Sequence, residues 1–518
     1  MNDHDVPEEA KRRRTFAIIS HPDAGKTTLT ERLLLHGHAI TAAGSVRARP
    51  GRRSTTSDWM QIERDRGISI ASTVLRFEHR GTVINLVDTP GHEDFSEDTY
   101  RVLTAVDAAL MVIDGANGVE ERTLRLFEVC RERGTPLLTF VNKCDRPCLP
   151  PLELLDRIQE AIGIAPTPVT WPIAQGREFQ GVAIRHTQTV RRFDRTSAGA
   201  IAGERLVNEA DLDRRDPDIA AALEEVALLD AVGADLDRPS FLEGRSTPTY
   251  FGSALMGFGV GDVLDAVVDL APAPSPVHDT AGVPRELEAP FSGFVFKVQS
   301  NMDARHRDRV AFIRVCSGRF ARGMALTRSR GNTRFLANHV HDVFGRGRST
   351  LDEAFPGDVI GLSNARDLRL GDTVFAADPV AFPAPRAFTP ELFAEARNVD
   401  PQRSKQFRSG LAFLDEEGVV QVLRHQDRGD QLPVLGAIGD LQFQIFQARM
   451  EQEFDTRVEL TRLPPKVARS TDRASESILA TIPRLEVLRR SSGEALALFP
   501  STFIIDQVRR EFPDLVLR

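Results

Sequence analysis

The stretch that decides the fold of this chain is Ser20-His21-Pro22-Asp23-Ala24-Gly25-Lys26-Thr27. It follows an apolar run at 15–20 that predicts a buried strand, and it precedes an amphipathic run at 26–36 that predicts a helix ending at Gly37. A turn in this position is typical of a phosphate-binding loop, because backbone N–H groups and the helix N-terminus can surround phosphate oxygens. In such a loop the positively charged ammonium group of Lys26 contacts the β- and γ-phosphates, and the Thr27 hydroxyl can ligate Mg²⁺. Ser20 replaces the first glycine usual in this motif.

A second motif follows the apolar strand predicted at 82–87, and its sequence is Asp88-Thr89-Pro90-Gly91-His92. An aspartate at the carboxyl end of a strand can hold Mg²⁺ through water, and the N–H of Gly91 can reach the γ-phosphate because no side chain blocks it. Taken alone, Asp88 is better explained as a turn-forming or helix-capping acid. Behind a phosphate loop, the motif indicates a nucleotide triphosphate site.

The third motif, which indicates the base, is Asn142-Lys143-Cys144-Asp145 after the apolar strand predicted at 137–141. The carboxylate of Asp145 can accept hydrogen bonds from guanine N1–H and the exocyclic amine together, a donor pair that adenine lacks. A mismatch of this kind is typically worth about 10⁴–10⁵ in discrimination. The stem of Lys143 can lie against the base, and Asn142 can brace the loops. The three motifs together predict GTP as the nucleotide.

A fourth segment, Ser253-Ala254-Leu255, ends a further predicted strand at 248–251 and can offer backbone N–H groups to guanine O6. A simple polar turn explains this segment equally well without the other motifs.

The arrangement of apolar and amphipathic runs predicts an α/β protein with three domains. Strands at 108–113 and helices at 95–106, 119–133 and 260–270 complete the pattern of a doubly wound parallel sheet. We expect an N-terminal tail at 1–13, a P-loop GTPase domain at 14–275 with an acidic insertion at about 175–247, a β-barrel at 286–381 and an α+β domain at 387–518. The Pro-rich stretches 271–276 and 382–385 are natural boundaries.

Composition places the chain among ordinary globular proteins, with 41% apolar and 27% charged residues and a net charge of −8. It contains no apolar run of about 18 residues, and its first ten residues lack a signal pattern, so we expect neither a membrane span nor a secretory leader. Four cysteines suit a reducing cytoplasm. Cys144 and Cys148 lack a second pair that would complete a zinc site, and two unpaired thiols are the simpler interpretation.

The charge is divided unevenly along the sequence. Residues 291–350 carry 12 Lys and Arg against 3 Asp, a net charge of +9, whereas residues 201–270 carry 15 Asp and Glu against 5 Arg, a net charge of −10. Such asymmetry favours one basic face for a polyanion, with ordinary solvated surface as an equal alternative. The phenylalanines of the basic region lie at strand spacing, so we expect them in the core.

The motifs also carry a family resemblance. Asp65-Arg66-Gly67-Ile68-Ser69-Ile70, followed by residues 88–95, resembles the translational GTPases, which act on the ribosome. Within that superfamily the chain is most similar to the class II bacterial release factors, the family of peptide chain release factor 3. The segments that carry this similarity are 15–30, 57–60, 92–101, 170–172, 301–312, 416–422 and 439–443.

The resemblance implies a ribosome-dependent GTPase of translation termination, which stimulates dissociation of class I release factors after peptide release and leaves on GTP hydrolysis. It implies GTP/GDP and Mg²⁺ as cofactors, with Thr27, Ser69 and Asp88 around the metal. It also implies that His92 orients the attacking water, in the role that glutamine has in Ras-like enzymes. A helix-capping histidine is the simpler alternative for His92.

The resemblance further implies the ribosome, both RNA and proteins, as partner, with no DNA, no membrane and a monomeric cytoplasmic protein. The arginines expected to meet the RNA backbone are Arg305, Arg307, Arg309, Arg314, Arg319 and Arg322. Another ribosome-directed GTPase, for translocation quality control or antibiotic protection, is the alternative within the superfamily. A GTP-dependent binding module that does not hydrolyse its nucleotide is the alternative outside it.

Overall fold

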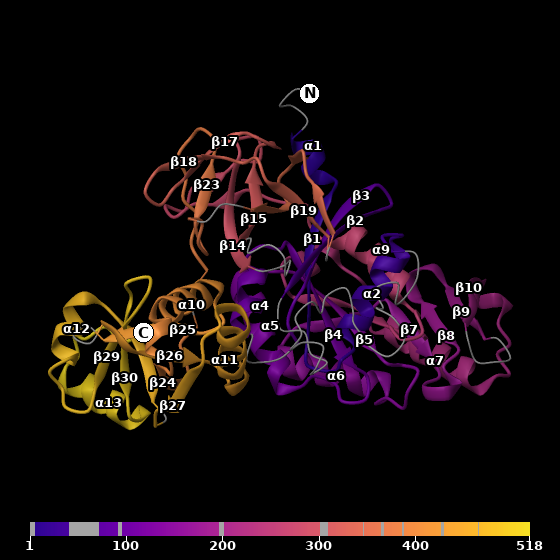
Figure 1. Ribbon diagram of the computed structural model, residues 1–518. Helices are drawn as coiled ribbons and strands as arrows, with labels where there is room; N and C mark the ends of the chain where they lie inside the picture. The colour runs from indigo at the N-terminus through magenta and orange to yellow at the C-terminus, as the bar shows by residue number, and fades with distance from the viewer. Residues whose placement is uncertain are drawn as a thin grey trace. The chain divides into compact units, whose positions relative to one another are not determined.

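The protein is seen in a computed structural model that describes residues 6–40, 72–91, 96–195, 201–300, 309–344, 347–363, 367–385, 388–425, 429–464 and 466–518. The chain divides into two compact units, and the second consists mainly of residues 386–518. Figure 1 shows the elements of both units.

The first unit contains a sheet of seven described strands in the order β2-β3-β1-β4-β5-β11-β6. Neighbouring strands are parallel except β2 with β3. The doubly wound sheet predicted from the sequence is therefore confirmed. The strands are β1 (Arg13–Ser20), β2 (Thr73–His79), β3 (Thr82–Asp88), β4 (Ala108–Asp114), β5 (Leu137–Asn142), β6 (Ala165–Pro168) and β11 (Ser246–Phe251).

Helices cover both faces of this sheet because its central strands are apolar on both sides. Phe16 and Ile18 of β1 share one buried cluster with α2 (Lys26–His36), α8 (Arg238–Leu242) and α9 (Val260–Leu270). Ala17 and Ile19 share the other with α4 (Ser96–Leu103), α5 (Glu121–Arg133) and α6 (Pro151–Ile162). Helix α4 ends three residues before its predicted end, where the Thr104 hydroxyl donates to the Arg101 carbonyl at 2.6 Å.

The acidic insertion is an antiparallel sheet in the order β10-β9-β8-β7 with one long helix. Its first strand precedes the predicted start at 175, because Trp171 is fully buried and anchors it. The Trp171 ring N–H donates to a carboxylate oxygen of Glu225 at 2.8 Å, so part of the acidic charge serves internal packing. The elements are β7 (Thr170–Ile173), β8 (Gly181–Ile184), β9 (Thr189–Arg195), β10 (Ile201–Asn208) and α7 (Pro217–Ala231).

The β-barrel has its described strands in the order β18-β17-β23-β14-β15-β22-β19-β20, all antiparallel, with β16 and β21 paired separately. Phe296, Phe312 and Phe320 are fully buried, which confirms that the phenylalanines of this region form the core. The strands are β14 (Ser292–Ser300), β15 (Arg309–Ser317), β16 (Phe320–Ala321), β17 (Ala325–Arg328), β18 (Thr333–Leu336), β19 (Val340–Phe344), β20 (Gly347–Thr350), β21 (Glu353–Ala354), β22 (Val359–Ser363) and β23 (Thr373–Phe375), preceded by the short pair β12 (Val277–His278) and β13 (Pro284–Arg285).

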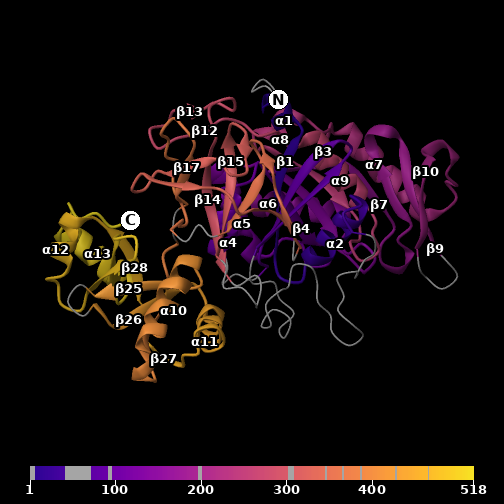
Figure 2. The ribbon, with the colours of Figure 1, turned by 45° about the horizontal axis from the view of Figure 1, so that its top comes forward.

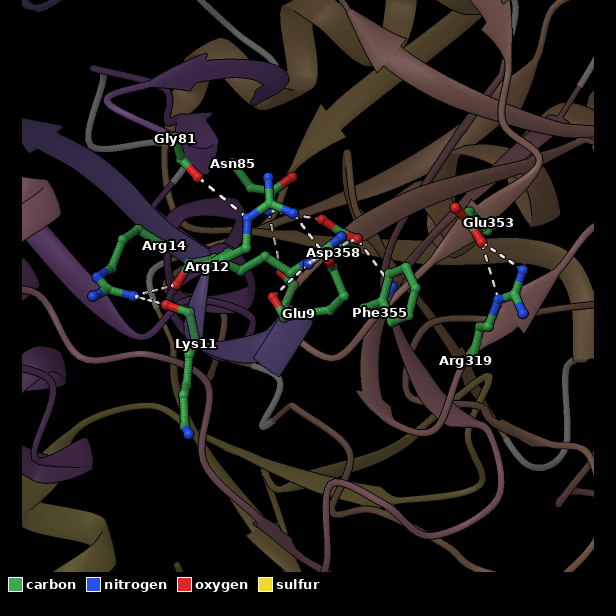
Figure 3. A network of polar contacts seen from close by, with 12 residues as sticks. Glu9, Lys11, Arg12, Arg14, Gly81, Asn85, Arg319, Glu353, Phe355 and Asp358 are labelled. Atoms are coloured by element: carbon green, nitrogen blue, oxygen red, sulfur yellow. Dashed lines mark hydrogen bonds and ion pairs between the residues drawn. The ribbon is translucent and has the colours of Figure 1, made fainter. Parts of the chain in front are cut away.

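A buried polar network joins the barrel to the amino end of β1 (Figure 3). The Arg13 guanidinium donates to Asp358 at 2.8 Å and also pairs with Glu9 at 2.7 Å. The Thr15 hydroxyl donates to the Gly357 carbonyl at 2.6 Å. Residues 6–11, which we expected to belong to a tail, form α1 (Val6–Lys11), because Val6 and Ala10 are buried and Glu9 holds Arg13.

The expectation that Arg314 faces RNA is wrong. Its guanidinium donates to both carboxylate oxygens of Asp107, at 2.8 and 2.7 Å, and to the Gly357 carbonyl at 2.7 Å, and its side chain is only 6% exposed. The charge of Arg314 therefore holds the barrel to the first sheet at the amino end of β4. Arg319 and Arg322 pair with Glu353 and Asp352. Arg309 donates to the Leu368 carbonyl, whereas Arg305 and Arg307 lie outside the described residues.

The second unit is an α+β domain on an antiparallel sheet in the order β27-β24-β26-β25-β29-β30-β28. Figure 2 shows its helices α10, α11, α12 and α13. Helices α10 and α11 pack on one cluster of this sheet, and α12 and α13 pack against Ala497 and Phe499. Among the residues that the structure describes, no helix is long and apolar enough to cross a membrane. The elements are β24 (Leu392–Asn398), α10 (Ser404–Glu417), β25 (Gln421–His425), β26 (Gly429–Ala437), α11 (Asp440–Phe454), β27 (Val458–Arg462), β28 (Val467–Thr471), α12 (Arg473–Leu479), β29 (Glu486–Arg490), β30 (Ala495–Phe499) and α13 (Thr502–Glu511).

Candidate nucleotide site

The predicted phosphate loop connects the carboxyl end of β1 to the first residue of α2, Lys26. The loop turns back on itself with positive backbone φ angles at Asp23 (65°) and Gly25 (95°). No side chain caps the N-terminus of α2, so its first N–H groups remain for an anion. Within the loop, Ser20, His21 and Ala24 are buried, and Pro22 and Thr27 are partly exposed.

The second motif meets this loop because β3 lies beside β1 in parallel register, with Ile18 opposite Asp88. The Lys26 ammonium donates to the Asp88 carboxylate at 2.6 Å, and both groups are almost fully buried. The Thr89 hydroxyl donates to the Ile18 carbonyl at 2.6 Å and fixes the turn that begins there. The sheet thus brings a cation and a carboxylate together at its carboxyl edge, as the two motifs predict.

The turn continues through buried Pro90 to Gly91, which lies over the phosphate loop. A Cβ atom built on Gly91 would lie 3.9 Å from both Lys26 Cε and Pro22 Cα. The N–H of Gly91 is therefore near the space where Lys26 would meet a phosphate. His92 and Ser69, the predicted water-orienting and switch residues, lie outside the described residues.

Asn142 ties the guanine motif to the other loops from the end of β5. Its amide nitrogen donates to the Ala24 carbonyl at 2.7 Å, and its amide oxygen accepts from the Ala254 N–H at 2.8 Å. A Cβ atom on Gly25 would lie 2.3 Å from this same amide nitrogen, so only glycine fits there. The predicted bracing geometry of Asn142 is present in the structure.

Asp114 positions Lys143, and sequence reasoning missed it. The Lys143 ammonium donates to an Asp114 carboxylate oxygen at 2.7 Å, while Lys143 itself has a φ angle of 71°. Burial acts to raise the pKa of Asp114, but hydrogen bonds from Lys143 and the Ala116 N–H outweigh it and lower that pKa. The sequence feature that could have identified Asp114 is an acidic residue at the carboxyl end of a predicted strand. Asp114 lies opposite Asn142 in the parallel pairing of β4 with β5.

The 253–255 segment closes the site against Asp145. The Ser253 hydroxyl donates to the Asp145 carboxylate, and the buried Cys144 N–H donates to the Gly252 carbonyl at 3.0 Å. Arg32 of α2, also missed from the sequence, donates to the Ala254 and Leu255 carbonyls at 3.1 and 2.6 Å. The carbonyls are thereby turned toward Arg32, while Leu255 stays 56% exposed.

The donor set of the site fits a hard cation that shares its ligands with phosphate. Among the described residues, no cluster of three or more His, Cys, Asp and Glu could hold a metal by itself. Asp88 and the Thr27 hydroxyl are oxygen donors at the edge of the loop, and Mg²⁺ is typically bound by one or two protein oxygens plus substrate phosphates. The residues present therefore suit Mg²⁺ with a nucleoside triphosphate.

Comparison with known protein families finds three matching domains. Residues 11–273 match the elongation factor Tu GTP binding domain, residues 290–377 match elongation factor G domain 2, and residues 382–509 match the C-terminal domain of class II release factor RF3. A crystal structure of a protein from Thermus thermophilus shares the fold, with a TM-score of 0.70 at 23% identity over 88% of this chain and 68% of that one. The fold and these domains define a translational GTPase, which binds GTP and GDP and is activated by the ribosome.

Curated relatives define the family more closely. A protein from Gloeobacter violaceus named peptide chain release factor 3 is 49% identical over 90% of this chain and 89% of its own length. Proteins of the same name from Acaryochloris marina and Bordetella pertussis are 44% and 50% identical, covering 99% and 87% of this chain and 96% and 84% of their own lengths. The chain belongs to the peptide chain release factor 3 family.

Proposed function

We propose that this protein binds the ribosome after peptide release and stimulates the dissociation of the class I release factor, and that GTP hydrolysis then releases the protein itself. The observation that carries the proposal is that similarity to release factor 3 proteins extends through the C-terminal unit, which matches the class II release factor family over residues 382–509. On this proposal the protein acts in the cytoplasm as a monomer, without DNA or a membrane as partner.

In the proposed site, the phosphate loop from Ser20 to Thr27 binds the triphosphate, and its contacts support that role. Lys26 pairs with Asp88 at 2.6 Å, and charge on a γ-phosphate would compete for the same ammonium. Mg²⁺, held by Thr27, Ser69 and Asp88, would neutralise charge on the β- and γ-phosphates. Gly91 donates its N–H to the γ-phosphate.

The guanine base is proposed to lie between Lys143 and the 253–255 segment. Asp145 accepts from guanine N1–H and the exocyclic amine, and the Ser253 hydroxyl orients its carboxylate. Asn142 keeps this loop in register with the phosphate loop through Ala24 and Ala254. The base and phosphate halves of the site are therefore connected through one side chain.

His92 is proposed to orient the water that attacks the γ-phosphate. It follows Gly91 directly, and Gly91 is placed near Lys26 and Pro22. In the free protein we expect slow hydrolysis, because the imidazole must be brought into position by the ribosome.

The test measures GTP turnover with and without ribosomes that carry a bound class I release factor, and follows dissociation of that factor in parallel. We expect strong stimulation of turnover and faster dissociation. Stimulation without dissociation would favour a different ribosomal GTPase, and no stimulation would exclude a role on the ribosome.

A variant pair tests the role of His92 within the same assay. We expect His92→Ala to lose most ribosome-stimulated turnover while it still binds GTP. His186→Ala changes an exposed histidine of the insertion and should hydrolyse GTP as the wild type does. Unchanged turnover in His92→Ala would remove the proposed catalytic role.

A further inference from the structure

Two of the four cysteines lie in the loop that carries the guanine motif. Cys144 stands between Lys143 and Asp145, and Cys148 follows four residues later. Cys144 is buried and Cys148 is partly exposed. The Cys144 thiol donates to the Val141 carbonyl at 3.6 Å, and the Cys148 thiol reaches back to the carbonyl of Lys143, the residue bonded to Cys144, so the two cysteines are neighbours in one turn.

The backbone of the guanine motif holds this pair in place. The Cys148 thiol lies 3.4 Å from the Lys143 carbonyl and 3.2 Å from the Arg146 carbonyl. The Arg146 N–H donates to the Lys143 carbonyl at 2.9 Å, which makes the turn that folds Cys148 back. A Cβ atom on Gly115 would lie 2.7 Å from the Cys148 sulfur, so the glycine after β4 leaves the space that the thiol fills.

The two thiols differ in pKa and exposure. Cys148 has the properties of the attacking thiol, and Cys144 has those of the thiol that resolves the intermediate. The hydrogen bond from Cys144 lowers the pKa of Cys148, against the effect of burial. The same hydrogen bond, together with burial, raises the pKa of Cys144. Cys148 is therefore the partly exposed thiol that ionises first, and thiolates are the species that react with oxidants.

The other two cysteines provide the contrast. Cys130 and Cys316 are fully buried, and burial raises the pKa of each to about 12. Neither should react before the native structure opens.

We propose that Cys144 and Cys148 are an oxidation site at which a hydroperoxide forms an intramolecular disulfide that weakens guanine nucleotide binding. The inference rests on the nucleotide site proposed above. The Cys148 thiolate attacks one peroxide oxygen, the O–O bond breaks, and Cys148 becomes a sulfenic acid while hydroxide leaves. The Cys144 sulfur then attacks the Cys148 sulfur, and the sulfenic oxygen leaves with the Cys144 proton as water. Two thiols are oxidised, and hydrogen peroxide is reduced to two molecules of water.

The disulfide affects the base site because Cys144 is fixed on both sides. Its N–H donates to the Gly252 carbonyl at 3.0 Å, and its carbonyl accepts from the Gly176 N–H at 2.9 Å. A disulfide requires the sulfur atoms to approach to about 2.05 Å, well inside a thiol–thiol contact. Closing that gap strains the backbone between Lys143 and Asp145, because Cys144 is held to Gly252 and Gly176. The carboxylate of Asp145 then no longer meets the base correctly.

The experiment uses the full-length protein with hydrogen peroxide as the oxidant and fluorescent GDP as the ligand. We expect peptide mapping to find a Cys144–Cys148 disulfide, and we expect the affinity for GDP to fall about tenfold or more and to recover with dithiothreitol. Cys148→Ser should bind GDP like the reduced wild type and resist peroxide. Cys130→Ala should respond to peroxide as the wild type does.

Three results would overturn the inference. The first is the absence of the disulfide after peroxide treatment, and the second is a disulfide that leaves GDP affinity unchanged. The third is an equal loss of affinity after peroxide treatment of Cys148→Ser. Failure of the reduced wild type to bind GDP would instead reject the proposed nucleotide site, and the peptide map would still decide whether the disulfide forms.

Discussion

Asp145 is the residue that we expect to select the nucleobase. In Asp145→Asn the two guanine donors lose their carboxylate acceptor, so GDP affinity should fall about 10²- to 10⁴-fold, since each charge-assisted hydrogen bond is worth about 1.5–3 kcal/mol. The new amide N–H matches the second carbonyl of xanthine, so XDP should gain affinity in the variant. Competition between XDP and GDP for the protein measures both effects.

A matched control for this substitution is available on α6. Asp156 is exposed there, and Asp156→Asn changes the net charge equally without touching the site. It should keep the wild-type preference for GDP. An Asp145→Asn variant that still prefers GDP over XDP would show that another group reads the base.

Asp114 makes stability depend on pH at the acidic end. The folded protein lowers the pKa of Asp114, because hydrogen bonds from Lys143 and the Ala116 N–H outweigh burial. The ionised carboxylate therefore adds stability above its unfolded pKa of about 3.9, and this contribution is lost as pH falls through the lowered folded pKa. Thermal unfolding between about pH 2.5 and pH 5 should show a steeper loss in the wild type than in Asp114→Asn.

The control for Asp114 is Asp352, which pairs with Arg322 on the surface and is 77% exposed. Asp352→Asn should leave the pH dependence of unfolding as it is in the wild type. Equal slopes for Asp114→Asn and the wild type would contradict the assigned contribution of Asp114.

At the scale of elements, the junction between β1 and α2 depends on Gly25. Its φ angle is 95°, and a Cβ atom would lie 2.3 Å from the Asn142 amide nitrogen. Gly25→Ala should therefore push Asn142 off the Ala24 carbonyl and lower GDP affinity by about tenfold or more. Titration with fluorescent GDP measures this loss.

A substitution at Gly134, the residue after the last turn of α5, distinguishes the effect of backbone strain from the steric clash at Gly25. Its φ angle is 64°, and nothing lies within 4 Å of its Cβ position. Gly134→Ala should cost about 1 kcal/mol of stability and leave GDP binding intact. Similar losses of GDP binding in both variants would show that strain alone disrupts the site.

Some elements were predictable from the sequence, and others were not. The helices α2 and α9 have their predicted bounds, because each combines a helical period with a glycine at one end. The strands β6 and β7 were not predicted, because Ala165–Pro168 and Thr170–Ile173 are short and contain prolines. Their β structure depends on the pairing of β6 with β11, which is distant in sequence, and of β7 with β8.

At the scale of the first compact unit, the Arg314–Asp107 pair holds the barrel and the sheet together. Their side chains are 6% and 16% exposed. Arg314→Met leaves the largely buried Asp107 carboxylate without its ion-pair partner, so unfolding in urea should show a loss of about 3–5 kcal/mol. Burial already raises the pKa of Asp107, and loss of the guanidinium would raise it further.

The double variant Arg314→Met with Asp107→Leu tests whether the loss comes from an unpaired charge. Replacing both members of a buried pair by apolar groups of similar size often costs little, so most of the stability should return. A double variant as unstable as the single one would show that the interface needs the hydrogen bonds of Arg314 to Gly357 as well.

The nucleotide motifs, their place at strand ends and the order of the domains were predictable without a structure. These features are local, since a strand, a turn and a helix are encoded by neighbouring residues and by a period that can be counted. The sequence could not show that Asp114 binds Lys143, that Arg32 binds the 253–255 segment, or that Cys148 folds back toward Cys144.

Which charged side chains form internal ion pairs became visible in the folded structure and not before. Arg314 looks like its basic neighbours in the sequence, yet the barrel places it against Asp107, 207 residues away along the chain. Pairing between residues that are distant in sequence depends on how sheets and loops pack, and amino-acid composition does not reveal it. The same packing brings the carboxyl ends of β1, β3, β4 and β5 to one edge, where the separate motifs become one site.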